Sequence, residues 1–185
     1  DWPTFAYILL IGMGGMGMIL FEFLAAWVFG REFSDRTAKE LLALPTGRGV
    51  IVAAKLTLLA VWTQALGLWN YGLGMLIGRA ADIPGGSAAL EASTFGTLLA
   101  ISLLSFLLLP CVAYAASLGR GYLPPMAWAI GTLILTQLAN ALGWAEWFPW
   151  AAPILLAETA GPKGGMVPAY SIVMVAVTFL IGAAA

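Results

Sequence analysis

The sequence predicts an all-α protein, a polytopic transmembrane helical bundle. Of its 185 residues, 62% are hydrophobic and only 9% are charged, whereas soluble domains have about 45–50% apolar and about 25% charged residues. The mean hydropathy of +0.96 is also typical of a membrane protein. Long apolar runs without two-residue alternation favour helices over barrel strands, because a helix satisfies its own backbone hydrogen bonds within the bilayer.

Five stretches are long and apolar enough to cross a bilayer, which needs about 20 helical residues. They are residues 4–29, 50–78, 93–118, 123–143 and 167–185. We therefore expect one transmembrane domain that spans residues 1–185. A further short helix is expected at about residues 149–159, lying along the membrane interface.

Lysine and arginine residues predict the orientation of the spans, because they are enriched in cytoplasmic connections. Six lie in or beside the first and third connections: Arg31, Arg36, Lys39, Arg48, Lys55 and Arg120. The second and fourth connections hold only Arg79 and Lys163. We therefore expect the first and third connections in the cytoplasm and residue 1 outside. That orientation predicts a sixth span before residue 1, so that this domain lacks the first span of the intact subunit.

The composition argues against several classes of function. A formal net charge of −1 is unsuited to nucleic acid, because binding phosphates needs a surplus of basic residues. The chain has no histidine, which removes histidine-ligated metals and Ser–His catalysis. Its one cysteine, Cys111, is too few for a disulfide or a cysteine zinc site. We therefore expect no metal and no catalytic centre.

One acid, Glu22, lies inside a predicted span. A carboxylate near the bilayer centre costs about 3 kcal/mol, so this side chain should face protein or water rather than lipid. At helical spacing it shares a face with residues suited to helix packing: Gly15, Met18, Ala25 and Ala26. Two interpretations stay open: a proton or substrate site, or a protonated or hydrogen-bonded glutamate with a structural role.

Polar and small residues recur along one face of two other spans. In the second span they follow every seven residues: Thr57, Gln64, Tyr71 and Gly78. In the fourth span they follow every four residues: Thr132, Thr136 and Asn140. Such stripes either line a pathway or hold helices together, and both interpretations stay open. The candidate pathway lining is a set of four side chains: Glu22, Gln64, Tyr71 and Asn140.

A glycine-rich run, Gly12-Met-Gly-Gly-Met-Gly17, lies within the first span. It matches the dinucleotide-binding pattern G-x-G-x-x-G, but that fingerprint works between a strand and a helix of a soluble domain. Within a membrane span the same glycines instead predict a small-residue face that lets a neighbouring helix approach closely.

The connection at residues 31–49 is the most charge-dense part of the chain. Within it, Thr37-Ala-Lys-Glu40 has the capping-box pattern, in which the Thr oxygen accepts from the Glu amide and the Glu carboxylate reaches back. Three leucines supply an apolar side, and Pro45 disfavours continuation of the helix. The pattern predicts a short amphipathic cytoplasmic helix, with an ordinary charged loop as the alternative.

Several short motifs in and after this connection resemble a known family. They are Gly30-Arg-Glu, Asp35-Arg-Thr, Leu41-Leu-Ala-Leu-Pro, Arg48 and Ala54-Lys, and later Phe148-Pro-Trp-Ala-Ala-Pro. They resemble the first cytoplasmic loop and the last external segment of the ABC transporter type-2 permease family, which includes bacitracin- and lantibiotic-export permeases. The resemblance implies a multi-pass protein of a prokaryotic plasma membrane.

The resemblance also implies a mechanism. In that family the first loop carries a coupling helix that docks into a separate cytoplasmic ATPase subunit, and two permease copies or halves form the pathway. The matching coupling residues of this chain are Arg31, Glu32, Asp35, Arg36, Thr37, Lys39 and Glu40. The chain has no G-x-x-x-x-G-K-[ST] motif, so ATP and Mg are expected in the partner and no cofactor in this chain. The substrate implied is amphipathic, such as a peptide antibiotic or a lipid, and membrane lipid surrounds the bundle.

Two other functions stay open at this point. An ion-coupled secondary transporter would use Glu22 as its ion or proton site. An intramembrane enzyme acting on lipid or peptide would need convergent ionisable residues at membrane depth, of which the predicted spans offer Glu22 alone, so this alternative is the less favoured.

Overall fold

The computed structural model describes residues 1–37, 46–161, 164 and 166–184. Every regular element in these ranges is helical, which confirms the predicted all-α fold. Among the described residues, three helices are long and apolar enough to cross a membrane: Trp2–Ser34, Arg48–Ala80 and Ala88–Gly119. The prediction of five full spans is therefore confirmed in part.

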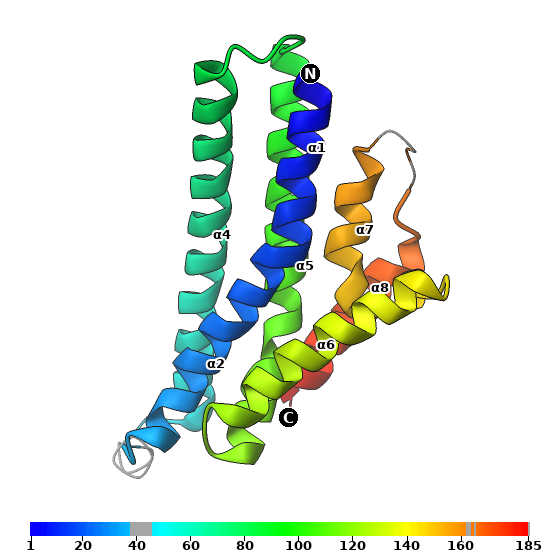
Figure 1. Ribbon diagram of the computed structural model, residues 1–185. Helices are drawn as coiled ribbons and strands as arrows, with labels where there is room; N and C mark the ends of the chain where they lie inside the picture. Colours follow the sequence, from blue (N-terminus) through cyan, green and yellow to red (C-terminus); the bar gives the residue numbers. More distant parts are fainter. Residues whose placement is uncertain (38–45, 162–163, 165, 185) are drawn as a thin grey trace.

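The first of these helices is built from three consecutive segments: α1 (Trp2–Gly12), the π-helix η1 (Met13–Gly17) and α2 (Met18–Ser34). It bends at η1, the glycine-rich run (Figure 1). A π-helix widens the turn by one residue and interrupts the regular α-helical hydrogen bonds, which accounts for a bend at this place.

The helix α2 continues beyond residue 29, where the sequence predicted the span to end. Arg31 and Glu32 therefore belong to its last turns and not to a loop. Two local effects favour this extension. A basic side chain near a helix C-terminus interacts well with the helix dipole, and Arg31 pairs with Asp35 four residues later.

The helices α4 (Arg48–Ala80) and α5 (Ala88–Gly119) each exceed the predicted spans by a few residues. α5 has the central position, because it contacts α1, α2, α4, α6, α7 and α8 (Figure 1). The core accordingly forms between α5 and its neighbours, with Leu98, Ile101 and Leu109 fully buried against the first helix.

The predicted fourth and fifth spans are the helices α6 (Leu123–Ala141) and α8 (Ala169–Ala184). Neither is among the three helices that meet the length and hydropathy expected of a span. α8 is short, at 16 residues, and α6 carries two prolines in its first turn together with Gln137 and Asn140 near its end. In Figure 1, α6 runs obliquely to α5.

Two 3₁₀ turns, η2 (Ala145–Trp147) and η3 (Pro149–Ala151), lead from α6 to the helix α7 (Ala152–Thr159). The predicted short helix at 149–159 is thus present, and its position along the membrane interface stays a prediction. α7 packs against α1, η1 and α5 and runs beside them (Figure 1). Small residues permit this: a Cβ added to Gly14 would lie 2.9 Å from the Pro153 carbonyl oxygen. The predicted small-residue face is therefore confirmed.

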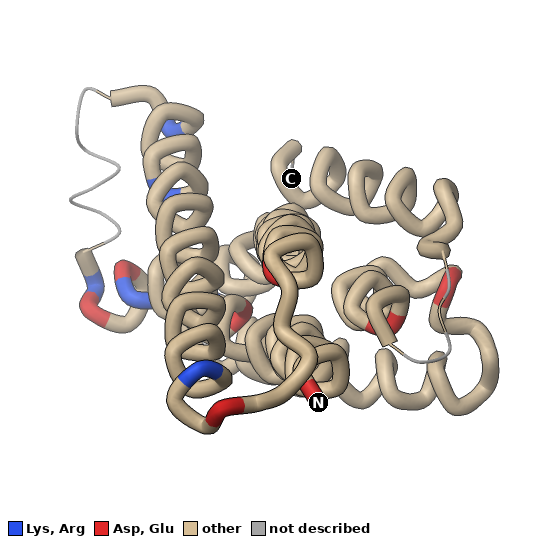
Figure 2. The backbone as a smooth tube through the Cα atoms, turned by 90° about the horizontal axis from the view of Figure 1, so that it is seen from above, with Lys and Arg blue, Asp and Glu red and all other residues tan. Residues whose placement is uncertain are grey.

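The connections alternate between the two ends of the bundle. The end of α2, the start of α4 and the α5–α6 turn lie at one end, and the N-terminus and the α4–α5 connection lie at the other (Figure 1). Viewed along the bundle, the Lys and Arg residues that can be seen lie on the side of α2 and α4 (Figure 2). This arrangement agrees with the predicted alternation of the connections, and their assignment to cytoplasm or exterior stays a prediction.

Candidate functional site

Glu22 lies at the meeting point of three elements that are far apart in the sequence. Its side chain is on α2 and is only 1% exposed. The Trp150 indole N–H of η3 donates to Glu22 Oε1 over 2.8 Å. The Thr132 hydroxyl of α6 lies 3.2 Å from each oxygen of the same carboxyl group. The predicted intramembrane acid therefore faces protein, as the sequence indicated.

The hydrogen-bond partners satisfy Glu22 in either protonation state. As a carboxylate it accepts from the Trp150 indole and the Thr132 hydroxyl. As a carboxylic acid it still accepts from Trp150 and can donate to the Thr132 oxygen, because that hydroxyl also lies 3.0 Å from the Ala129 carbonyl oxygen and can donate there. The site is thus chemically suited to a structural role and to proton transfer.

A small cavity of about 30 Å³ lies beside this carboxyl group. That is room for about one water molecule. Its polar lining comes mainly from α6, where Thr136 and Gln137 follow Thr132, while the glycines of η1 line it from the first helix. Gln137 is exposed, so the polar side of α6 continues from the buried Glu22 carboxyl to the surface of the chain.

The other three predicted pathway residues do not line this cavity. Gln64 is half-buried, and its amide nitrogen has no hydrogen-bond partner among the described residues. Tyr71 donates to the Glu91 carbonyl oxygen over 3.2 Å and packs edge-on against Phe95 of α5. Asn140 is exposed on α6. The contacts of Tyr71 are those of a residue that joins α4 to α5, and the pathway interpretation stays a prediction.

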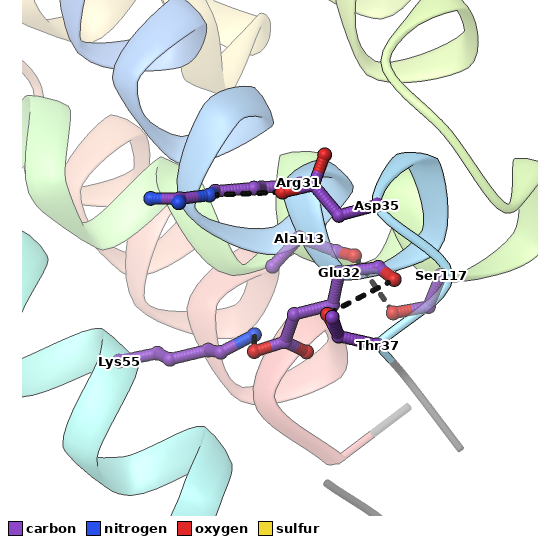
Figure 3. A network of polar contacts seen from close by, with 7 residues as sticks. All are labelled: Arg31, Glu32, Asp35, Thr37, Lys55, Ala113 and Ser117. Atoms are coloured by element: carbon purple, nitrogen blue, oxygen red, sulfur yellow. Dashed lines mark hydrogen bonds and ion pairs between the residues drawn. The ribbon is translucent and has the colours of Figure 1, made fainter. Parts of the chain in front are cut away.

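At the end of the bundle where α2 ends and α4 begins, Arg31 and Asp35 form an exposed pair. The Arg31 Nε lies 3.1 Å from an Asp35 carboxylate oxygen (Figure 3). The Arg31 guanidinium also lies 5.3 Å from the centre of the Trp27 ring. Exposed pairs of this kind contribute little to stability, about 0–1 kcal/mol. They leave both charges at the surface, as a docking surface requires.

Glu32 has a different environment. Its carboxylate lies 2.6 Å from the Lys55 ammonium of α4, and this ammonium lies 4.9 Å from the centre of the buried Phe29 ring (Figure 3). Glu32 was assigned from the sequence to the ATPase contact together with its neighbours. In the structure its carboxylate pairs within the chain with Lys55, for which the sequence predicted a role only in orientation. The ATPase contact of Glu32 stays a prediction.

The remaining coupling candidates begin where α2 ends. Arg36 has a left-handed backbone with φ of 58°, and it follows the C-cap residue Asp35. The Thr37 hydroxyl donates to the Glu32 carbonyl oxygen over 3.5 Å. Lys39 and Glu40 lie outside the described residues, so the capping box and the coupling helix stay predictions.

Sequence reasoning missed Trp150 as a site residue. A buried indole N–H needs an acceptor, and an acid at membrane depth needs a donor. These two requirements are the signal that could have paired Trp150 with Glu22.

Comparison with known families matches residues 3–138 to the family described as ABC-2 family transporter protein. This chain belongs to that family. Over 183 residues it is also 28% identical to the bacitracin transport permease protein BCRB of Bacillus licheniformis, covering 98% of this chain and 85% of that relative. No solved structure matches. The ABC-2 match includes Glu22 and Thr132 and ends before Trp150.

Membership in the ABC-2 family decides several of the predictions. The chain is the membrane subunit of a transporter and not an enzyme, and it is a multi-pass protein of a bacterial membrane. ABC-2 permeases work with a cytoplasmic ATPase subunit. The resemblance seen in the first connection is thereby confirmed.

Proposed function

We propose that this ABC-2 permease exports an amphipathic substrate, such as a peptide antibiotic or a lipid, while a separate cytoplasmic ATPase hydrolyses Mg-bound ATP. The likeness to a bacitracin transport permease, over nearly the whole chain, supports a substrate of this kind. The chain itself then needs no cofactor. ATP drives transport because the ATPase, when ATP closes it, favours one of two packings of the permease.

The polar side of α6 is the observation that best supports a transport pathway in this chain. Gln137, which lines the cavity beside Glu22, is exposed there, and Asn140 is exposed further along the same helix. Polar groups at membrane depth are costly against lipid and normally face protein or water. We place the pathway along this α2–α6 side, which a second copy of the chain completes, while membrane lipid covers the apolar outer faces.

Transport in vesicles tests this function against its strongest rival. With the permease and its ATPase in proteoliposomes, we expect uptake of a labelled amphipathic peptide to need hydrolysable ATP and to persist when a protonophore collapses the proton gradient. Uptake that needs no ATPase and disappears with the proton gradient would support a secondary transporter that uses Glu22.

A further inference from the structure

The pair Glu32–Lys55 joins the two helices that flank residues 38–45 in the chain. Glu32 lies near the end of α2, and Lys55 lies two turns into α4. Figure 3 shows the Lys55 side chain pointing toward Glu32, while Arg31 and Asp35 pair with each other separately. The pair therefore links the two described helices on either side of the connection that the sequence predicts to contact the ATPase.

This pair is more shielded than its neighbour. The Lys55 and Glu32 side chains are 16% and 25% exposed, against 58% and 50% for Arg31 and Asp35. The Phe29 ring beneath the Lys55 ammonium adds a cation–π contact. Because water screens a shielded pair less, the Glu32–Lys55 link should hold its geometry better than the exposed pair.

Elsewhere α4 meets the first helix mainly through apolar and small residues, with one further polar contact, in which the Asn70 amide nitrogen lies 3.6 Å from the Met13 sulfur. Gly74 lies against Leu9, and Gly78 lies against Trp2, both toward the opposite end of the bundle. Among the described residues, α4 is the least buried of the three long helices. Among the described residues, the Glu32–Lys55 pair is thus the ion pair that joins α2 to α4, and it lies at the end of the bundle where α2 ends and α4 begins.

We propose that Glu32 and Lys55 are positioning residues that make α2 and α4 move as one unit when the ATPase acts on the connection between them. The proposal rests on the proposed function. The segment of α2 from Glu22 to Glu32 is one unbroken α-helix about 15 Å long. A displacement at the link therefore reaches the Glu22 carboxyl and its partners on α6 and η3.

Charge reversal and charge exchange test this proposal in the permease–ATPase complex. Lys55→Glu and Glu32→Lys each place like charges together. We expect either variant to keep its ATPase through purification but to lose substrate-stimulated ATP hydrolysis by about fivefold or more, the size of a typical coupling effect. The double exchange Glu32→Lys/Lys55→Glu restores the pair in reverse and should recover most of that loss.

The matched control is the exchange Arg79→Glu/Glu91→Arg together with its single reversals, which act on the ion pair between α4 and α5. These residues lie outside the predicted ATPase contact, so their variants should keep substrate-stimulated hydrolysis. Lys55→Met keeps most of the apolar stem without the charge, and serves if a reversal does not insert. Coupled hydrolysis that survives in the single variants, or that the exchange does not restore in an assembled complex, would overturn the proposal. So would loss of assembly in the exchange variant, because that shows a purely structural role. If the wild-type chain binds no ATPase, the proposed function fails, and this proposal fails with it.

Discussion

At the scale of single residues, Glu22 shows how a carboxyl group is accommodated at membrane depth. Leaving such a group unpaired in hydrocarbon costs about 3 kcal/mol. The Trp150 indole and the Thr132 hydroxyl offset this cost, and they draw α2, α6 and η3 together in doing so. The same contacts make Glu22 a link between the helices on either side of the proposed pathway.

Glu22→Gln and Glu22→Leu should therefore behave differently. The Gln amide oxygen can accept from Trp150 and its NH₂ group can donate to Thr132, so assembly and thermal stability in detergent should be retained. Leu leaves the Trp150 indole N–H without its acceptor, although the Thr132 hydroxyl can still donate to the Ala129 carbonyl oxygen. The unpaired indole should lower stability by about 1–3 kcal/mol and reduce the thermal unfolding midpoint. Trp150→Phe should lower the thermal unfolding midpoint as well. Glu158→Leu, which replaces a glutamate at the end of α7, is the control. Equal unfolding midpoints for the Gln and Leu variants would contradict the hydrogen-bonding role.

The same pair of variants separates structure from proton transfer. If Glu22→Gln transports normally, the group is not required to titrate, and the ion-coupled alternative fails. If this variant assembles well but no longer transports, proton transfer at Glu22 gains support over the ATP-driven account.

At the scale of elements, the π-helix η1 is where the first helix bends and where α7 comes closest. The backbone of Pro153 and Ile154 lies against Gly14, within 3.0 Å of the position a Cβ would take. Glycines therefore serve this helix in two ways. They tolerate the irregular backbone, and they remove the side chain that would hold α7 away.

Gly14→Ala should be destabilising, because its Cβ meets backbone atoms that cannot rotate aside. Overpacking of this kind costs about 1–3 kcal/mol, visible as a lower thermal unfolding midpoint of the purified protein. Gly12→Ala is a matched control, since its Cβ would meet nothing within 4 Å. At that position Ala should stabilise the helix by about 0.5–1 kcal/mol. If both variants shift the midpoint equally, η1 is not a close-packing site.

The helices were predictable from the sequence to a greater extent than their contacts. Apolar runs gave the places of α4 and α5 within a few residues, because length and hydropathy are local properties. The position of α7 was not predictable, because it depends on close packing of its backbone against Gly14, which is far away in the sequence. For the same reason Glu22 was found as an acid inside a span, while its bond to Trp150 and the Glu32–Lys55 pair needed the structure.

At the scale of the whole molecule, the alternating connections predict which parts of the chain are reached from outside the cell. In a Cys111→Ala background, Thr46→Cys should resist a membrane-impermeant thiol reagent in intact cells, and Ala88→Cys should react. Both positions are exposed, and Ala88 leaves the hydroxyl of Ser87 free to cap α5. After permeabilisation both should react. The reverse pattern in intact cells would overturn the predicted orientation.

The central claim is that this chain is the membrane subunit of an ABC exporter and depends on a separate ATPase. The most direct test is to purify the tagged chain from its native membrane and to identify and quantify the proteins that remain bound. The account predicts an ABC ATPase in equal amount, with two copies of the chain in the complex and ATP hydrolysis that rises with substrate. An intact, transport-competent chain that carries no ATPase and is driven by the proton gradient would contradict it.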